Sequence, residues 1–341
     1  MKRILTCCLM LFFGFGKTTG QDIHFSFAEQ TPLLLNPAMA GANHEMEGIV
    51  NYRNQWSSLG DPYKTTSASF HSRINSVKRR SGNILALGIR LHNDQAGSPG
   101  MVSNAASLVI ADHVKTGQFS KIGVGMDLGV GQRYIKSADG RWASQYDGTN
   151  YNPGSASGET LENTNFRYFD AGIGILYSYE HRTGTLAKTM DRMLNAGISA
   201  YHVNRPNNSF IIENADRLPL RYTFFAHAEM ALSGTDIAVL PGITVHQQGN
   251  FSEYLIGSSI KYTLMDKTRY TGFQKPLSLT AGLFGRLKDA AIVKFVMDWD
   301  QYSFGYAFDF NTSRLKGFTN GNGAHEIFLR FSVSEIRPLR R

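Results

Sequence analysis

The feature that most constrains this chain is an alternation of apolar and polar residues in stretches of about ten residues. The stretch YSFGYAFDFN at 302–311 places five aromatic side chains at every second position, with Ser, Gly, Ala, Asp and Asn between them. Successive side chains of a strand point to opposite faces, so this stretch has one aromatic and one polar face. A soluble sandwich buries such a face under a second sheet, whereas a membrane barrel turns it toward lipid.

The same alternation recurs along the chain. At 122–131, Ile, Val, Met, Leu and Val alternate with four glycines and one aspartate. Similar windows lie at 85–92, 169–179, 291–299 and 327–333. Windows of this length, bounded by Gly, Asn, Asp or Pro, are typical of barrel strands. They predict one all-β domain, a transmembrane outer-membrane β-barrel of about fourteen antiparallel strands.

The polar face of these windows favours the barrel over a soluble sandwich. It carries Gly, Ser, Asp, Arg, Lys and Glu along every strand, as a wet interior does, and no later apolar run approaches the roughly 20 residues of a membrane helix. Aromatic residues stand near strand ends, where barrels meet lipid headgroups: Trp56, Tyr134, Tyr179, Tyr254, Trp299 and Tyr302. An even number of strands returns both ends of the barrel to the periplasm, and the two longest connections, 135–165 and 204–219, then lie outside.

The first residues predict export. A positive start, Met1-Lys2-Arg3, precedes an apolar run at 4–15 and a small polar stretch, which together read as a signal peptide at 1–20. Both cysteines lie inside it, so the mature chain forms no disulfide. The remaining predicted parts are an irregular N-terminal segment in the periplasm or lumen at 21–44, the barrel at 45–334 and a basic tail at 335–341.

Nothing in the sequence predicts catalysis. The histidines are scattered, no HExxH or glycine-rich phosphate loop is present, and the glycines of 123–129 alternate inside a strand. The formal net charge of +8 is spread along the chain and does not predict nucleic-acid binding. We therefore predict no enzyme activity, no cofactor and no metal.

Several motifs carry a family resemblance. The segment after the leader contains QD at 21–22, FS at 25–26, PL at 32–33, NPA at 36–38, AG at 40–41 and YRNQW at 52–56. DAGIGILY at 170–177, NAGISAYHVNRPNNSF at 195–210, GYAFDF at 305–310 and GAHEIFLRF at 323–331 follow in order. Together they resemble the PorP/SprF family of type IX secretion outer-membrane proteins of the Bacteroidota, over nearly the whole mature chain. The sequence departs from the pattern at GYAFDF, where a Tyr-Asp pair is expected, and at Phe27-Ala28, where Gln-Tyr is expected.

The resemblance implies an outer-membrane barrel that acts in type IX protein secretion or gliding motility. Its implied partners are outer-membrane lipid, a periplasmic ring of lipoprotein and soluble subunits, and a secreted adhesin or other cargo with a C-terminal sorting domain. A passive porin for small solutes is the alternative function.

The NPA motif is a candidate partner-binding element. Asn36, Pro37 and Gly41 lie in a stretch too irregular for a strand, because proline favours extended geometry before it and glycine allows a tight bend. Residues 21–44 then either enter the lumen or dock on a partner, or else cap the periplasmic rim.

The YRNQW motif supplies two further candidates, Arg53 and Trp56. Arg53 falls on the polar face and Trp56 on the opposite one. We expect Arg53 either to recognise a ligand or to pair with a lumen carboxylate. The carboxylates we consider are Asp127, Glu229 and Asp298.

The predicted periplasmic turns are basic, and Arg79, Arg80, Arg182 and Arg192 are candidate contacts to an acidic surface of the secretion ring. The alternative is solvated turns that touch lipid headgroups. The loop at 135–165 is rich in Ser, Asn, Gly and Tyr and contains Trp142 and Tyr146. Such composition suits adaptable recognition, so this loop plugs the lumen or meets the cargo, unless it is simply disordered at the surface.

Overall fold

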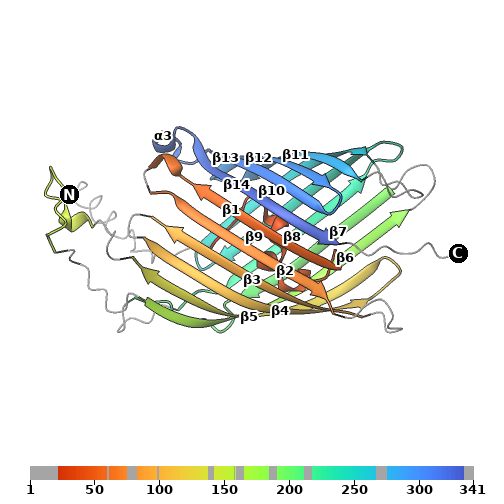
Figure 1. Ribbon diagram of the computed structural model, residues 1–341, viewed down its shortest axis with the longest axis horizontal. Coiled ribbons are helices and arrows are strands. Elements are labelled where there is room, and N and C mark those ends of the chain that lie inside the picture. Colours follow the sequence, from red (N-terminus) through yellow and green to blue (C-terminus); the bar gives the residue numbers. More distant parts are fainter. Residues whose placement is uncertain are drawn as a thin grey trace, which may run out of the picture.

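The computed structural model describes residues 22–59, 61–74, 83–97, 100–136, 142–156, 158, 165–183, 190–210, 217–265 and 275–333. Within them, fourteen strands form one closed antiparallel barrel (Figure 1). This confirms the predicted fold class and strand number. The predicted signal peptide and the predicted tail at 335–341 lie outside the described residues.

Each of the six alternating windows named above lies within one of the observed strands. The strands are β1 Met46–Gln55, β2 Tyr63–Arg73, β3 Ile84–Ala96, β4 Met101–Lys115, β5 Ser120–Ile135, β6 Asn165–Thr183, β7 Met190–Tyr201, β8 Arg221–Ala231, β9 Ile237–Gln248, β10 Phe251–Met265, β11 Leu277–Arg286, β12 Ala290–Trp299, β13 Tyr302–Asn311 and β14 Asn322–Val333. Each strand pairs with its neighbour in sequence, and β14 pairs with β1 to close the barrel. No helix among the described residues is long and apolar enough to cross a membrane.

The alternation sorts side chains between the two faces of the wall. On β13, Tyr302, Phe304 and Phe310 point outward with about half of each side chain exposed, while Ser303 and Asp309 are buried inside. The other strands follow the same pattern, with mostly apolar side chains outside and mostly polar ones inside. This distribution is the one expected of a barrel whose outer surface faces lipid.

The two ends of the barrel differ. We call the end where β1 begins and β14 ends the turn end, and the opposite end the loop end. The two longest connections, 136–164 and 202–220, both join strands at the loop end. The short helix α3 Lys316–Thr319 also lies there (Figure 1).

Residues 22–44, which we call the lumen segment, lie inside the barrel. They form three short turns: η2 Ala28–Gln30, α2 Pro32–Leu35 and η3 Pro37–Met39. Asp22 lies at the loop end, where its backbone N–H donates to Gln248 at the end of β9. The chain then descends to the turn end and enters β1. The lumen segment therefore spans the interior from one end of the barrel to the other.

Local sequence explains the shape of this segment. Pro32 and Pro37 each occupy the first position of a helical turn, where proline's fixed backbone is compatible. Asn36 caps the second of these turns, since its Oδ1 accepts a bond of 2.8 Å from the N–H of Ala38. Gly41 adopts a φ of +66°, and a Cβ at this position would lie 2.6 Å from the Cβ of Ala86, so the site requires glycine.

Apolar side chains of the lumen segment pack against apolar residues on the inner face of the wall. Three clusters result: Phe27 and Ala28 with Leu255, Ile292 and Phe328; Leu35, Ala38 and Met39 with Leu176 and Phe225; and Leu33 and Ala40 with Ala86 and Val109. Burying this apolar surface stabilises the segment in the lumen. The interior is thus a packed core in these places rather than a water-filled channel.

Candidate functional site

Arg53 on β1 lies at the centre of a buried ion cluster near the loop end. Its Nη2 donates to Asp309 Oδ2 at 2.8 Å and its Nη1 donates to Glu326 Oε2 at 3.2 Å. The side chains of all three residues are at most 2 % exposed. Arg53 stands directly opposite Glu326 in the β1–β14 pairing, so closure of the barrel brings the two together.

Arg53 pairs with carboxylates of the lumen, as one of the two alternatives expected, but its partners are not Asp127, Glu229 or Asp298, the three acids considered. Each of these carboxylates bonds another cation: Asp127 bonds Arg90, Glu229 bonds Lys261 and Asp298 bonds Arg330. The physical reason is register, because each pair joins strands that are close neighbours around the wall. The partners of Arg53 follow from which strand closes the barrel, and sequence spacing does not report this.

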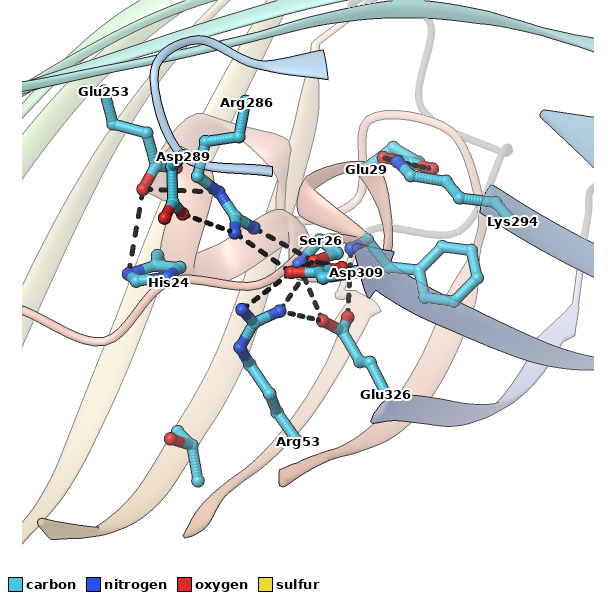
Figure 2. Close-up of polar contacts among 12 residues, drawn as sticks. His24, Ser26, Glu29, Arg53, Glu253, Arg286, Asp289, Lys294, Asp309 and Glu326 are labelled. Carbon is cyan, nitrogen blue, oxygen red and sulfur yellow. Dashed lines mark hydrogen bonds and ion pairs between the residues drawn. The ribbon is translucent and has the colours of Figure 1, made fainter. Parts of the chain in front are cut away.

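The ion cluster holds the lumen segment by its backbone. The N–H of Ser26 donates to Glu326 Oε2 at 2.6 Å, and the N–H of Phe27 donates to Glu326 Oε1 at 2.9 Å. One carboxylate of the wall therefore receives two adjacent peptide N–H groups, as Figure 2 shows. Bonds of this kind to a charged acceptor are stronger than neutral ones.

The Ser26 hydroxyl completes the cluster. Its Oγ donates to Asp309 Oδ1 at 2.6 Å and accepts from Arg53 Nη1 at 2.6 Å and from Arg286 Nη2 at 2.9 Å (Figure 2). Arg286 also donates to Asp309 Oδ2 at 2.9 Å. We call Ser26, Arg53, Arg286, Asp309 and Glu326 the clasp. Two arginines face two carboxylates, so the buried charges compensate one another.

A second anchor holds the start of the segment at the loop end. His202, just after β7, donates from Nδ1 to Asp170 Oδ1 at 2.8 Å and from Nε2 to Asp22 Oδ2 at 2.5 Å. Burial acts to lower the pKa of His202, but the charges and hydrogen bonds of Asp22 and Asp170 outweigh burial and raise it to about 9. Burial acts to raise the pKa of Asp22, yet His202 and Arg221 hold it well below its usual value. His202 is therefore an imidazolium at neutral pH, with both ring nitrogens as donors.

Asn36 and Pro37 of the NPA motif fix the middle of the segment. The Asn36 Nδ2 donates to the backbone carbonyls of Ile175 on β6 and Ile198 on β7, each at 3.0 Å. The facing wall positions are glycines: a Cβ at Gly125 or Gly174 would overlap the atoms of residues 36–38. These glycines of the alternating strands therefore make room for the NPA motif.

Gly41 and its neighbours tie the segment to the turn end. The carbonyl of Gly41 accepts from Arg73 Nε at 2.8 Å, and the carbonyl of Ala40 bonds His113 Nε2 at 2.8 Å. Lys121 Nζ donates to the carbonyl of Ala42. Side chains of β2, β4 and β5 thus satisfy consecutive backbone carbonyls of the segment.

The other predicted candidates lie away from the clasp. Trp56 follows β1 with a φ of 57° and packs edge-on against Tyr63, with ring centroids 5.2 Å apart. The N–H of Trp142 donates to Gln145 at 3.2 Å, and Tyr146 is exposed in the same loop.

The arginines of the turn-end connections are only partly described. Arg192 is an exposed residue of β7, and Arg182 lies near the end of β6. Arg79 and Arg80 fall outside the described residues.

Sequence reasoning missed most of the clasp and the second anchor. Ser26 lies in the FS motif, but Asp309, Glu326 and Arg286 look like ordinary polar-face residues of their strands. A usable signal was the set of large apolar residues at polar-face positions, such as Leu176, Phe225 and Phe328. Such residues inside a barrel require an apolar partner in the lumen.

Comparison of the chain with known protein families and solved structures agrees with this architecture. Residues 17–331 match the family of type IX secretion system membrane proteins PorP/SprF. The chain belongs to this family. It is thus a membrane component of type IX secretion, and its barrel places it in the outer membrane. No curated protein matches the sequence. No group of three His, Cys, Asp or Glu residues in the described part of the chain is arranged to hold a metal ion.

Solved barrels resemble the chain only distantly. The toluene transporter TbuX of Ralstonia pickettii has a TM-score of 0.48 and 11 % identity, over 89 % of this chain and 94 % of that one. The toluene transporter TodX of P. putida has a TM-score of 0.43 and 10 % identity, over 90 % and 94 %. The translocator domain of the autotransporter NalP from Neisseria meningitidis has a TM-score of 0.38 and 11 % identity, over 91 % and 96 %.

Proposed function

We propose that this PorP/SprF protein is a non-enzymatic subunit of type IX secretion that docks on the periplasmic ring and assists export or surface attachment of a secreted protein. The observation that carries the proposal is the lumen segment, which fills the interior and is fastened by the clasp near the loop end. A barrel built around such a segment is suited to hold partners rather than to conduct solutes.

The lengths of the connections support one orientation of the barrel in the membrane. Outer-membrane barrels have short turns on the periplasmic side and longer loops outside. The turn end then faces the periplasm, where the secretion ring lies, and the loop end faces the cell surface, where the cargo is displayed. The cargo contacts in this proposal are Trp142 and Tyr146, because their loop lies at the loop end.

In this proposal, the basic connections of the turn end are the surface that docks on the periplasmic ring. Arg79, Arg80, Arg182 and Arg192 give this end a positive charge that would steer it toward an acidic partner surface. The test changes these four arginines to glutamate and measures recovery of ring subunits with the tagged barrel from native outer membranes. A matched control changes four loop-end cations, Lys136, Arg205, Arg217 and Lys288, to glutamate. We expect ring subunits to be lost only from the turn-end variant; equal recovery from both variants contradicts ring docking at this end.

The porin alternative makes a different prediction about conductance. A porin reconstituted into a planar bilayer shows a steady open current, whereas a barrel filled by its own segment shows a closed lumen with rare openings. We expect the closed behaviour for the purified protein. A steady open current together with no recovery of ring subunits or cargo would favour the porin.

A further inference from the structure

The lumen segment fills the interior unevenly. In the half of the barrel nearer the turn end, it packs against β3–β6 and leaves a cavity of about 190 Å³ on the side of β7–β12. We call this cavity the turn-end cup. An apolar cavity of about 150 Å³ accommodates benzene, so the cup has room for a group of at least that size.

A proline lies inside β9, next to the cup. Because proline has no N–H, sheets normally place it on an edge strand, at the start of a strand or at a bulge, and a closed barrel has no edge strand. The pairing of β9 with β10 continues past Pro241, which stands opposite Ser258. On its other side, β9 shares no ladder pair with β8 at Leu240 or Pro241, although the two strands pair above and below this point. We call this gap, between residues 228–229 of β8 and 240–241 of β9, the seam.

The cup extends into the wall at the seam. By the alternation of their strands, Ala228 and Pro241 belong to the outer face, yet both line the cup. Just above the seam, Gly242 and Gly257 stand opposite each other and add no side chain to the inner face. The wall between the cup and the outer surface is therefore thin at this place.

The outer face around the seam is apolar. Met230, Ile243 and Ile260 occupy neighbouring outward positions and are 44 %, 39 % and 58 % exposed. They belong to the face that the barrel turns toward lipid. The seam therefore separates the cup from hydrocarbon rather than from water.

The lining of the cup changes from apolar to charged toward the turn end. Phe27, Phe284 and Leu240 line its upper part. Lys294 lies against both phenylalanine rings, and its charge is paired with Glu29. Nearer the turn end, the cup is lined by two ion pairs whose side chains are 20 to 26 % exposed: Lys261–Glu229 and Arg330–Asp298. A lipid of the adjacent leaflet has the same polarity, with its chains toward the bilayer centre and its polar group at the surface.

We propose that the turn-end cup binds the end of one acyl chain of a membrane lipid, which enters sideways through the seam while the polar group of the lipid stays at the turn-end surface. Pro241 favours this entry, because β9 cannot donate a ladder bond there and the seam separates at a lower cost than a fully paired stretch. Burial of the chain against Phe27 and Phe284 supplies the attraction. The inference goes beyond ring docking and does not depend on it.

The experiment reconstitutes the purified full-length barrel in vesicles that contain a phosphatidylethanolamine with a diazirine at the end of one acyl chain. After irradiation, mass spectrometry maps the labelled residues. We expect label on Met39 and Phe284, which line the cup, as well as on lipid-facing residues such as Leu283.

Two variants test the route of entry. Pro241→Val supplies the missing N–H and should reduce the label in the cup about two- to tenfold, the value of one hydrogen bond, without changing the label on Leu283. Ile243→Val is the matched control and should change neither label, because this residue lies on the same face of β9 but is paired on both sides, with Ala226 and Ile256.

A third variant tests the cup itself. Ser259→Trp places an indole in the cup and should abolish the label on Met39 and Phe284 while the label on Leu283 persists. Heat-modifiable migration on gels checks that each variant forms a barrel.

Two results would overturn the proposal. They are label confined to lipid-facing residues of the native barrel, and equal label in the cup of the native, Pro241→Val and Ile243→Val proteins. The measurement needs no ring subunit. A failure here therefore leaves ring docking intact, and a failure of ring docking leaves lipid binding by the cup intact.

Discussion

Replacing Glu326 by glutamine should release the lumen segment. Glu326 accepts the N–H groups of Ser26 and Phe27 at 2.6 and 2.9 Å and faces Arg53 at 3.2 Å. Glutamine keeps the shape but removes the charge and one acceptor. The variant barrel wall should still form, because its strand pairing does not depend on this side chain.

The magnitude follows from these contacts. Glutamine has one acceptor oxygen, so one of the two N–H groups keeps a neutral bond, which costs about 1 kcal/mol, and the other faces the amide NH2 and loses its bond, which costs about 1 kcal/mol or more. The docked state also keeps Arg53 buried with only one of its two carboxylate partners. The total loss in the free energy of docking is then about 2 to 4 kcal/mol. At 1.4 kcal/mol per tenfold change, the undocked population rises about 30- to 700-fold.

Single-channel recording in planar bilayers measures this population as the fraction of time that the lumen conducts. Glu229→Gln is the matched control, because it makes the same chemical change in the more exposed pair with Lys261 and has no bond to residues 22–44 among those described. Heat-modifiable migration on gels checks that each variant forms a barrel. If Glu326→Gln forms a barrel that conducts no more often than the control, the clasp does not hold the segment and the reasoning is refuted.

Three further predictions concern the same segment. Gly174→Ala should open the lumen in bilayer recordings, because its Cβ would overlap Asn36, whereas Gly285→Ala, whose nearest neighbouring atom is 3.9 Å away, should remain closed; equal behaviour would contradict this packing. Asn36→Ala should weaken docking by about 1 to 3 kcal/mol through the loss of two bonds to strand carbonyls, measured as faster thermolysin cleavage of the segment; unchanged cleavage would rule this out. The His202–Asp22 anchor should stabilise the docked segment fully below pH 6.5 and stop doing so as the pH rises through about 9, because the folded pKa of His202 is raised from 6.5 to about 9. Thermolysin cleavage of the segment should therefore accelerate over this pH range in the native protein. His202→Gln should flatten this pH profile.

Local sequence determines much of the barrel. Alternation along each strand decides which side chains point outward, so YSFGYAFDFN at 302–311 shows its aromatic face without reference to any other strand. Gly125 and Gly174 also belong to the polar face of this alternation, but the alternation alone does not explain why these two positions are glycine. The family motifs add the NPA element, whose helical turn and Asn36 cap depend only on adjacent residues.

The interior was decided by contacts that no local pattern encodes. Arg53 meets Glu326 because the first and last strands pair, across 273 positions of sequence. The clasp and the second anchor exist only once the segment has entered the closed wall, since each joins residues of the segment to strands distant in sequence. Period and propensity act between near neighbours along a chain, whereas closure of a barrel and filling of its lumen depend on three-dimensional register and volume.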